Sequence, residues 1–340
     1  MRATDARLAE VRRAVGSFVV DGFFRGSSRL ARLHPGAKLE RHHVSVERDI
    51  AYGDSGQGHH LLDVYRPTRA QGPLPVVLYV HGGGFRILSK DSHWIMGLAF
   101  ARRGYLVFVV NYRLAPKHRF PAALEDCAQA YAWVAKNAAR FGGDTSRLIL
   151  AGESAGANLV TAMTIAACFA RDEPYARAIH DVGLVPKAVV PACGILQVTD
   201  VERFERRRKL PAYLADRLHE VSAAYLPTEP ASVPLDLADP LCVLERGASP
   251  DRPLPPFFIP CGTKDLLLDD TRRLGKTLDV LGVKNEVAIY PGGVHAFHAM
   301  VFRAQAKQCW RDTYRFLDEV VGPPAASRDL SASSTSSRAP

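Results

Sequence analysis

The sequence predicts an α/β protein built on a mostly parallel sheet. Its middle part alternates short apolar runs of strand length with longer stretches in which apolar residues recur every three or four positions, a pattern typical of βαβ crossovers. The chain has 340 residues, of which 47% are hydrophobic and 23% charged, so it can bury a sizeable core. The expected strands are residues 76–80, 106–110, 148–151, 188–191, 257–260 and 287–290.

The clearest helical pattern follows the second expected strand. Pro121 opens it, because proline fits the first turn of a helix, and Gly142 and Gly143 end it. Its apolar side chains form one stripe that can pack on the sheet. They are Leu124, Cys127, Ala128, Tyr131 and Val134. A second helical pattern, residues 157–170, follows the third strand.

Two segments stand apart from this alternation. Residues 1–45 are arginine-rich and amphipathic, and residues 197–238 combine a basic run with apolar residues at helical spacing. Both are predicted to be helices outside the sheet, the second as an insertion in a main domain of residues 46–321. The tail, residues 322–340, is rich in Pro, Ala and Ser without a periodic apolar face, so it is predicted to be disordered.

Composition and charge argue against several classes of protein. No 18 consecutive residues are apolar and the first 33 residues lack a secretory pattern, so we expect no membrane span and a cytoplasmic protein. The six cysteines form no C-x-x-C pair, which argues against a zinc site or a disulfide framework. The net charge of +9 is spread along the chain without a nucleic-acid-binding motif, so we expect no nucleic-acid partner.

A nucleophile motif follows the third expected strand. Residues 152–156 read Gly-Glu-Ser-Ala-Gly, which is G-x-S-x-G between a strand and a helix, the context that this motif requires. Glycines flank the serine because the turn is too sharp for side chains two positions away. We therefore predict that Ser154 is a nucleophile exposed at a helix N-terminus, and not part of a structural Gly/Ser turn.

Three consecutive glycines follow the first expected strand. Residues 81–85 read His-Gly-Gly-Gly-Phe, so backbone N–H groups without a neighbouring Cβ can meet the Ala155 N–H to form an oxyanion hole. The alternative is a flexible loop. His81 is expected to fix this loop by hydrogen bonding and not to act as a base.

A serine nucleophile needs a histidine base and a carboxylate that orients it, in the chain order Ser, Asp, His. Asp265 follows the fifth expected strand and His295 follows the sixth, which places both at the sheet edge where Ser154 lies.

Other residues compete for these two roles. Two further carboxylates begin the next helical pattern, where acidic residues are favoured for structural reasons, and a second histidine follows three residues after the first. These alternatives are Asp269, Asp270 and His298. The remaining histidines, including His93, have no such placement.

One more motif adds to these: residues 111–126 read Asn-Tyr-Arg-Leu-Ala-Pro-Lys-His-Arg-Phe-Pro-Ala-Ala-Leu-Glu-Asp. Together the motifs make the chain resemble the hormone-sensitive-lipase-like esterases, the bacterial family IV branch of the α/β-hydrolases. The resemblance covers roughly residues 60–320. It implies an α/β-hydrolase fold with a mostly parallel central sheet, helices on both faces, and a helical cap made by residues 1–45 and by the insertion at about 197–238.

The resemblance also assigns roles to residues. Ser154 would be the nucleophile, His295 the general base and acid, and Asp265 its orienting carboxylate. The oxyanion hole would be Gly83, Gly84 and the Ala155 N–H, with Gly82 as a further candidate donor. Two features depart from the family pattern: Glu153 and Ala157 stand where Asp and Gly are usual, and Lys117 replaces an acidic residue.

The function that follows is hydrolysis of a carboxylic ester through an acyl-enzyme, with no metal or organic cofactor. A helical cap encloses a pocket of about 300 to 1,000 Å³, so short to medium acyl esters are the expected substrates. A non-catalytic small-molecule receptor on the same fold, an amidase and a lactonase are the alternatives. The expected partner is the ester substrate, and a homodimer is a candidate assembly. The basic run at 206–209 is interpreted as a solvated helix face and not as a contact for an anionic ligand or membrane surface.

Overall fold

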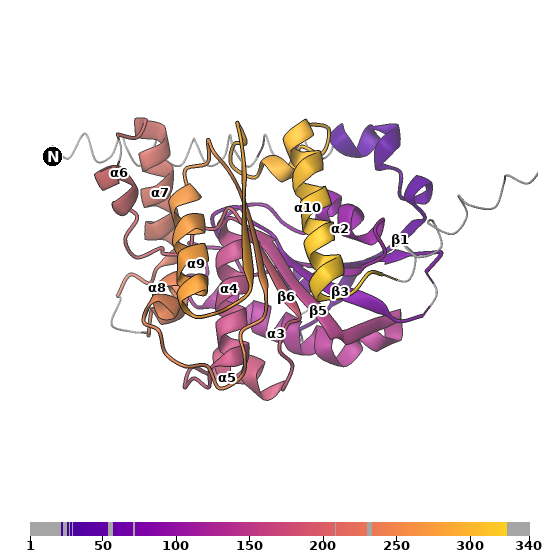
Figure 1. Ribbon diagram of the computed structural model, residues 1–340, viewed down its shortest axis with the longest axis horizontal. Helices are drawn as coiled ribbons and strands as arrows, with labels where there is room; N and C mark the ends of the chain where they lie inside the picture. Colours follow the sequence, from indigo (N-terminus) through magenta and orange to yellow (C-terminus); the bar gives the residue numbers. More distant parts are fainter. Residues whose placement is uncertain are drawn as a thin grey trace, which may run out of the picture.

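The computed structural model describes residues 30–53, 57–70, 72–207, 209–229 and 233–324, together with residues 22, 26 and 28. Its centre is an eight-stranded sheet in the order β1-β2-β4-β3-β5-β6-β7-β8. The strands are β1 (Val44–Ala51), β2 (Leu61–Pro67), β3 (Leu74–Val80), β4 (Leu106–Val110), β5 (Gly143–Glu153), β6 (Ala188–Ala192), β7 (Phe257–Gly262) and β8 (Asn285–Tyr290). Strands from β4 to β8 in this order pair in parallel, whereas β2 is antiparallel to β1 and β4, so the predicted mostly parallel sheet is confirmed (Figure 1).

The sequence predicts the parallel strands but misses β1 and β2. β1 lies at the sheet edge, where most of its side chains are exposed or half-buried, and its pairing with β2 shifts register between Glu47 and Ile50. β2 carries a fully buried carboxylate, Asp63, which receives the Lys90 Nζ at 2.8 Å. Polar residues in both strands therefore interrupt the apolar runs that mark the other strands. The sheet begins at Val44, at the end of the segment predicted to be helical.

Helices cover both faces of the sheet, as predicted. One face packs against α3 (Ala122–Asn137), α4 (Ala155–Cys168), α5 (Pro174–Asp181), α8 (Pro240–Glu245) and α9 (Leu268–Val280), and the other against α2 (Trp94–Ala101) and α10 (Ala304–Val320). In β3 the side chains alternate between the two cores: Leu78 belongs to the first, and Val77 and Tyr79 to the second. α3 starts directly after Pro121, and Gly142 in the left-handed conformation ends the 3-10 turn that follows it.

The segment between β6 and β7 carries helices that lie outside the sheet. α6 (Arg203–Arg207) and α7 (Ala212–Tyr225) stand beside α9 at one end of the molecule (Figure 1). Of the N-terminal segment predicted to be a cap, most positions before residue 30 lie outside the described residues, and so do residues 325–340 of the tail predicted to be disordered.

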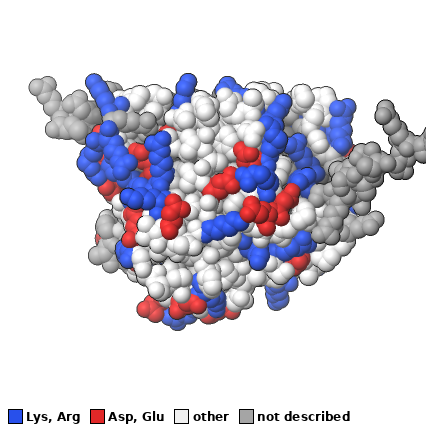
Figure 2. All heavy atoms as spheres, viewed as in Figure 1, with Lys and Arg blue, Asp and Glu red and all other residues white. Residues whose placement is uncertain are grey.

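Basic side chains of α6 are paired with acidic ones. Arg206 contacts Asp200 at 2.5 Å, and Arg207 contacts Asp269 at 3.2 Å. Figure 2 shows Lys and Arg mixed with Asp and Glu over the face that it presents. These pairs favour the interpretation of this run as a solvated helix face; Arg208 lies outside the described residues. Within the described part of the chain, no helix is both long and apolar enough to span a bilayer.

Candidate active site

Ser154 occupies a strained turn between β5 and α4. Its φ and ψ are 56° and −115°, a conformation that is costly for a residue with a side chain. Its N–H donates to the Ala192 carbonyl oxygen at 2.9 Å, which ties the turn to the end of β6. Ser154 is partly exposed, although every residue of α4 is buried. The structure thus has the strand–turn–helix geometry predicted for this motif.

The glycines of the motif are required by close backbone contacts. A Cβ at Gly152 would lie 2.7 Å from the Val80 carbonyl oxygen, and a Cβ at Gly156 would lie 2.0 Å from the same oxygen. The first turn of α4 therefore packs directly on the end of β3, where the triple-glycine loop begins.

This contact predicts a large loss of stability for Gly156→Ala. The added methyl group would overlap a main-chain oxygen, so we expect the free energy of unfolding to fall by about 3 kcal/mol, as in severe overpacking. Urea denaturation followed by circular dichroism measures it. Gly58→Ala is the control, because a Cβ there meets no atom within 4 Å. Equal denaturation midpoints for the two variants would contradict the packing argument.

Asp265 and His295 meet on the loops that follow β7 and β8. These loops touch through glycine: a Cβ at Gly262 would lie 2.1 Å from the Gly293 carbonyl oxygen. The His295 Nδ1 lies 3.0 Å from Asp265 Oδ2 and 3.1 Å from Oδ1. The Leu267 N–H donates to Asp265 Oδ1 at 2.8 Å, so the carboxylate is fixed from a second side. The predicted pair is therefore brought into direct contact.

The electrostatics of this pair favour an ionised aspartate. Burial would raise the pKa of Asp265, but the neighbouring His295 and the hydrogen bond from Leu267 outweigh it, and the pKa lies below its usual value. Burial likewise opposes the charged form of His295, yet the Asp265 carboxylate dominates and raises the pKa of the imidazole above 6.5. The His295 side chain is 43% exposed, whereas Asp265 is fully buried. One edge of the imidazole thus faces the acid while much of the ring remains accessible.

The competing carboxylates have structural partners. Asp270 is buried and accepts from the Leu196 N–H at 2.9 Å and from the Arg203 guanidinium at 2.5 Å. Asp269 pairs with Arg207. Both carboxylates hold the start of α9 against α6 instead of reaching His295.

The alternative base, His298, is buried behind the site. Burial lowers the pKa of its imidazole to about 4, so the ring is neutral near pH 7. Asp265 contacts His295 and not this ring. The predicted preference for His295 is therefore consistent with the geometry.

Two adjacent residues at the end of β6 contact the serine turn and the acid–base pair respectively. Cys193 follows Ala192, the residue that accepts from the Ser154 N–H. The Cys193 Sγ, a carboxylate oxygen of Asp265 and a ring nitrogen of His295 lie within 4.8 Å of one another. In the described part of the chain this is the group whose donor atoms are close enough for a metal ion. Because the aspartate and the histidine already bond each other there, a metal would have to replace that hydrogen bond.

The triple-glycine loop shows one departure from the prediction. The Gly82 N–H donates to Glu153 Oε1 at 2.6 Å, so this donor is already used, which argues against Gly82 as an oxyanion donor. Gly83 and Gly84 have φ values of 110° and 59°, which side chains rarely adopt. Within the described residues no acceptor receives the N–H groups of Gly83, Gly84 or Ala155.

The carboxylate of Glu153 collects several donors. The His93 Nε2 contacts Glu153 Oε1 at 2.7 Å, and the Tyr79 hydroxyl donates to Oε2. From the sequence, Glu153 is only a departure from the family pattern, and His93 has no predicted role. Nothing in the local sequence links the two residues, since the fold alone brings them together. His81, stacked on Tyr112 at 4.3 Å, is buried, which agrees with a loop-fixing role.

Helix α7 lies directly on this loop. A Cβ at Gly84 would meet the Val221 side chain at 2.7 Å, and Phe85 stacks on Tyr225 with ring centroids 3.6 Å apart. The next residue, Arg86, forms an ion pair with Glu220. Three consecutive loop residues thus contact the inserted helix.

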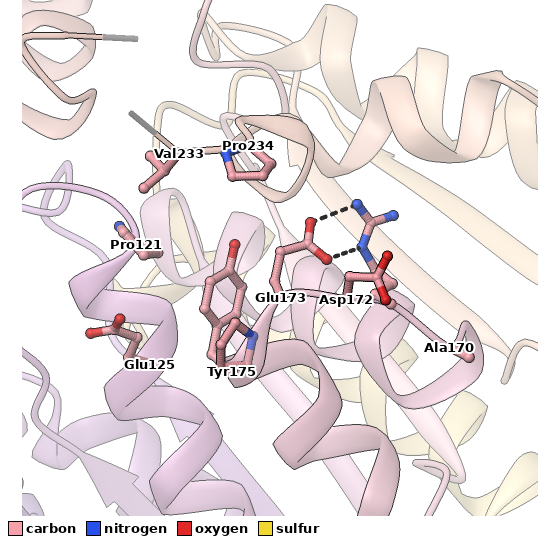
Figure 3. Close-up of a pocket in the computed structure, with 10 residues that line it drawn as sticks. Pro121, Glu125, Ala170, Asp172, Glu173, Tyr175, Val233 and Pro234 are labelled. Atoms are coloured by element: carbon pink, nitrogen blue, oxygen red, sulfur yellow. Dashed lines mark hydrogen bonds and ion pairs between the residues drawn. The ribbon is translucent and has the colours of Figure 1, made fainter. Parts of the chain in front are cut away.

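One cavity of the molecule lies away from Ser154. It measures about 660 Å³ and opens between the start of α3 and the segment that joins α4 to α5 (Figure 3). Its carboxylates already have partners: Glu125 pairs with Arg113, and Glu173 pairs with Arg171 at 2.8 Å. This cavity takes no part in the arrangement around Ser154.

Comparisons with known proteins agree with this geometry. Residues 77–299 match the model of a family described as having the alpha/beta hydrolase fold. The chain is 31% identical over 299 residues to carboxylesterase NlhH of Mycobacterium tuberculosis, covering 86% of this chain and 88% of that protein. The crystal structure of esterase LipW from Mycobacterium marinum superposes with a TM-score of 0.71 at 26% identity, covering 91% of each chain. A solved esterase of the bacterial hormone-sensitive lipase family gives a TM-score of 0.65 at 25% identity, covering 88% of this chain and 97% of that one.

The fold, the strained serine turn and these relatives agree with the resemblance seen in the sequence. The chain belongs to the α/β-hydrolase family and is a carboxylic ester hydrolase of its hormone-sensitive-lipase-like branch.

Proposed function

We propose that the protein hydrolyses short to medium acyl esters through Ser154, His295 and Asp265. The observation that carries this proposal is the 3.0 Å hydrogen bond between the buried Asp265 and the His295 Nδ1. It fixes the tautomer in which the opposite ring nitrogen, Nε2, is free to accept a proton. Ser154, strained at the start of α4, supplies the hydroxyl.

The reaction then has two steps. His295 takes the Ser154 proton as the hydroxyl oxygen attacks the ester carbonyl, and the protonated imidazole donates this proton to the departing alcohol. Water, deprotonated by His295, releases the acyl group in the second step. In both steps the tetrahedral oxyanion would accept from the N–H groups of Gly83, Gly84 and Ala155. The Asp265 carboxylate stabilises the imidazolium that forms each time.

The proposed substrate length rests on α7. This helix contacts Gly84, Phe85 and Arg86, so the inserted segment covers the oxyanion loop and limits the room beside it. We extend the proposal to residues 1–45 as the second part of this cap.

The test is a panel of p-nitrophenyl esters with acyl chains of two to twelve carbons. The expected result is a maximum of kcat/KM among the shorter chains. A maximum at the longest chain would overturn the proposed substrate size. No turnover of any ester, together with binding of a small apolar acid, would instead indicate a receptor.

The pH dependence follows from His295. The imidazole accepts a proton only in its neutral form, so kcat/KM should rise with pH through the pKa of His295. Because Asp265 raises this pKa above 6.5, the half-maximal point is expected above pH 6.5. A pH profile of kcat/KM measures it. A half-maximal point below that value would contradict the assigned base or its partner.

A further inference from the structure

Glu153 connects the two ends of the oxyanion loop. This loop, residues 82–93, leaves β3 at Gly82 and returns to α2 at His93. Glu153 Oε1 receives the Gly82 N–H at 2.6 Å and contacts the His93 Nε2 at 2.7 Å. A single oxygen of Glu153 thus contacts both ends of the loop. Glu153 is the residue directly before the proposed nucleophile.

Further contacts and burial restrict the movement of the Glu153 carboxylate. Tyr79 of β3 donates its hydroxyl to the second oxygen, and the side chain of Glu153 is almost fully buried. His93 is oriented in turn, because its Nδ1 lies 3.0 Å from the Ser89 carbonyl oxygen. A buried carboxylate is costly unless it is paired and hydrogen-bonded, and here each oxygen has a partner.

The charges of the two groups suit a buried ion pair. Burial alone would raise the pKa of Glu153, but His93 and the neighbouring His298 and Tyr79 lower it to about 2. The same carboxylate raises the pKa of the His93 imidazole against the effect of burial. The ring of His81 also stacks on His93, with ring centroids 5.3 Å apart.

We propose that Glu153 and His93 are positioning residues that set the oxyanion hole. This inference rests on the proposed ester hydrolysis and adds two residues to it. Holding the Gly82 N–H fixes the peptide between His81 and Gly82, at the start of the loop. Gly83 and Gly84 follow with positive φ values, and among the described residues their N–H groups have no acceptor. Glu153 thus binds one N–H donor of the loop, that of Gly82, and thereby positions the next two, those of Gly83 and Gly84.

The reach of the side chain matters for this role. Glutamate carries one more methylene than the aspartate usual in related sequences, which is about 1.5 Å of extra length. In this chain the longer carboxylate, which starts beside Ser154, contacts both Gly82 and His93.

The experiment compares Glu153→Ala, Glu153→Gln, His93→Phe and His93→Gln on one short ester. If the two residues aim the oxyanion donors, kcat should fall by about 10²-fold in Glu153→Ala and His93→Phe, with KM nearly unchanged. The affinity for a boronic acid, which mimics the tetrahedral intermediate, should fall by a similar factor. His93→Gln, which keeps a donor for Glu153, should recover part of kcat. Glu153→Gln, which keeps an acceptor for Gly82, should lie between wild type and Glu153→Ala.

The matched control is His219→Gln, which removes a histidine that contacts another glutamate, Glu205, at 3.0 Å and lies outside the oxyanion loop. It should keep a kcat close to that of the wild type. Folded Glu153→Ala and His93→Phe variants with wild-type kcat and boronate affinity would overturn the proposal, and so would a loss confined to KM.

A second measurement does not depend on activity or on any single variant. Glycine-selective ¹⁵N labelling reports hydrogen exchange of the Gly82 amide in the full chain. Exchange should be faster in His93→Phe and Glu153→Ala than in the wild type, and unchanged exchange in Glu153→Ala would overturn the role of Glu153 in holding the Gly82 N–H. A wild-type protein that cleaves no ester would overturn the proposed function. An active wild type with unaffected variants would overturn only the positioning role of Glu153 and His93.

Discussion

Replacing Ser154 by alanine is expected to lower kcat/KM for a short-chain ester by about 10⁴-fold or more. The Ser154 hydroxyl is the group that would form the covalent bond to the acyl carbon, so its loss removes the acyl-enzyme route altogether. The backbone at this turn has a positive φ whichever small residue occupies it, and alanine adds no bulk. Steady-state hydrolysis of p-nitrophenyl acetate measures the effect, and circular dichroism checks the fold.

The control for this variant is a serine within β5. Ser146→Ala removes a hydroxyl that bonds Asp144 in an exposed part of the strand, and it should leave the rate unchanged. Near wild-type turnover by a folded Ser154→Ala protein would overturn the assignment of the nucleophile. Covalent labelling by a small phosphonate should likewise be lost in the first variant and kept in the second.

Asp265→Asn is expected to cost about 10⁴-fold in kcat/KM as well. The asparagine amide keeps the size of the side chain but replaces one acceptor oxygen by an NH₂ group. It can therefore favour the wrong tautomer of His295, with the proton on Nε2, and it no longer stabilises the imidazolium. The half-maximal point of the pH profile should also move to lower pH, since the charge that raises the pKa of His295 is gone.

The two carboxylates at the start of α9 are the matched controls. Asp269→Asn should have little effect on kcat/KM, because its partner Arg207 is exposed. Asp270→Asn should act on stability, since it leaves the buried Arg203 guanidinium without its counter-charge; removing one partner of such a pair costs about 3 to 5 kcal/mol. Kinetics and urea denaturation separate the two effects. A larger kinetic loss in either control than in Asp265→Asn would move the acid to the helix.

The sequence was a good guide wherever one local pattern was sufficient. A G-x-S-x-G motif between an apolar run and a helical pattern implies one backbone geometry, and the structure has it at Ser154. Asp265 and His295 could be placed because both follow strands of a parallel sheet, whose carboxyl ends share an edge. Short-range rules of this kind depend on neighbouring residues, and those are visible in the chain.

The failures occurred where distant residues decide. β1 and β2 combine polar and apolar residues, and the buried Asp63 is tolerated in β2 only because Lys90 reaches it from another segment. Similarly, the sequence does not distinguish the three glycines of the oxyanion loop from one another. Which of their N–H groups stays free depends on Glu153, 71 residues further along the chain.

The sequence by itself therefore determined the α/β architecture, the strained serine turn and the order of the chemical groups along the sheet edge, because backbone sterics and apolar periodicity act over a few residues. The tertiary structure alone decided that Asp269 and Asp270 pair with arginines of α6, that the Gly82 N–H donates to Glu153, and that His93 also contacts this carboxylate. Hydrogen bonds and ion pairs between buried groups depend on positions within a few tenths of an ångström, which only the packing of all the elements together can set.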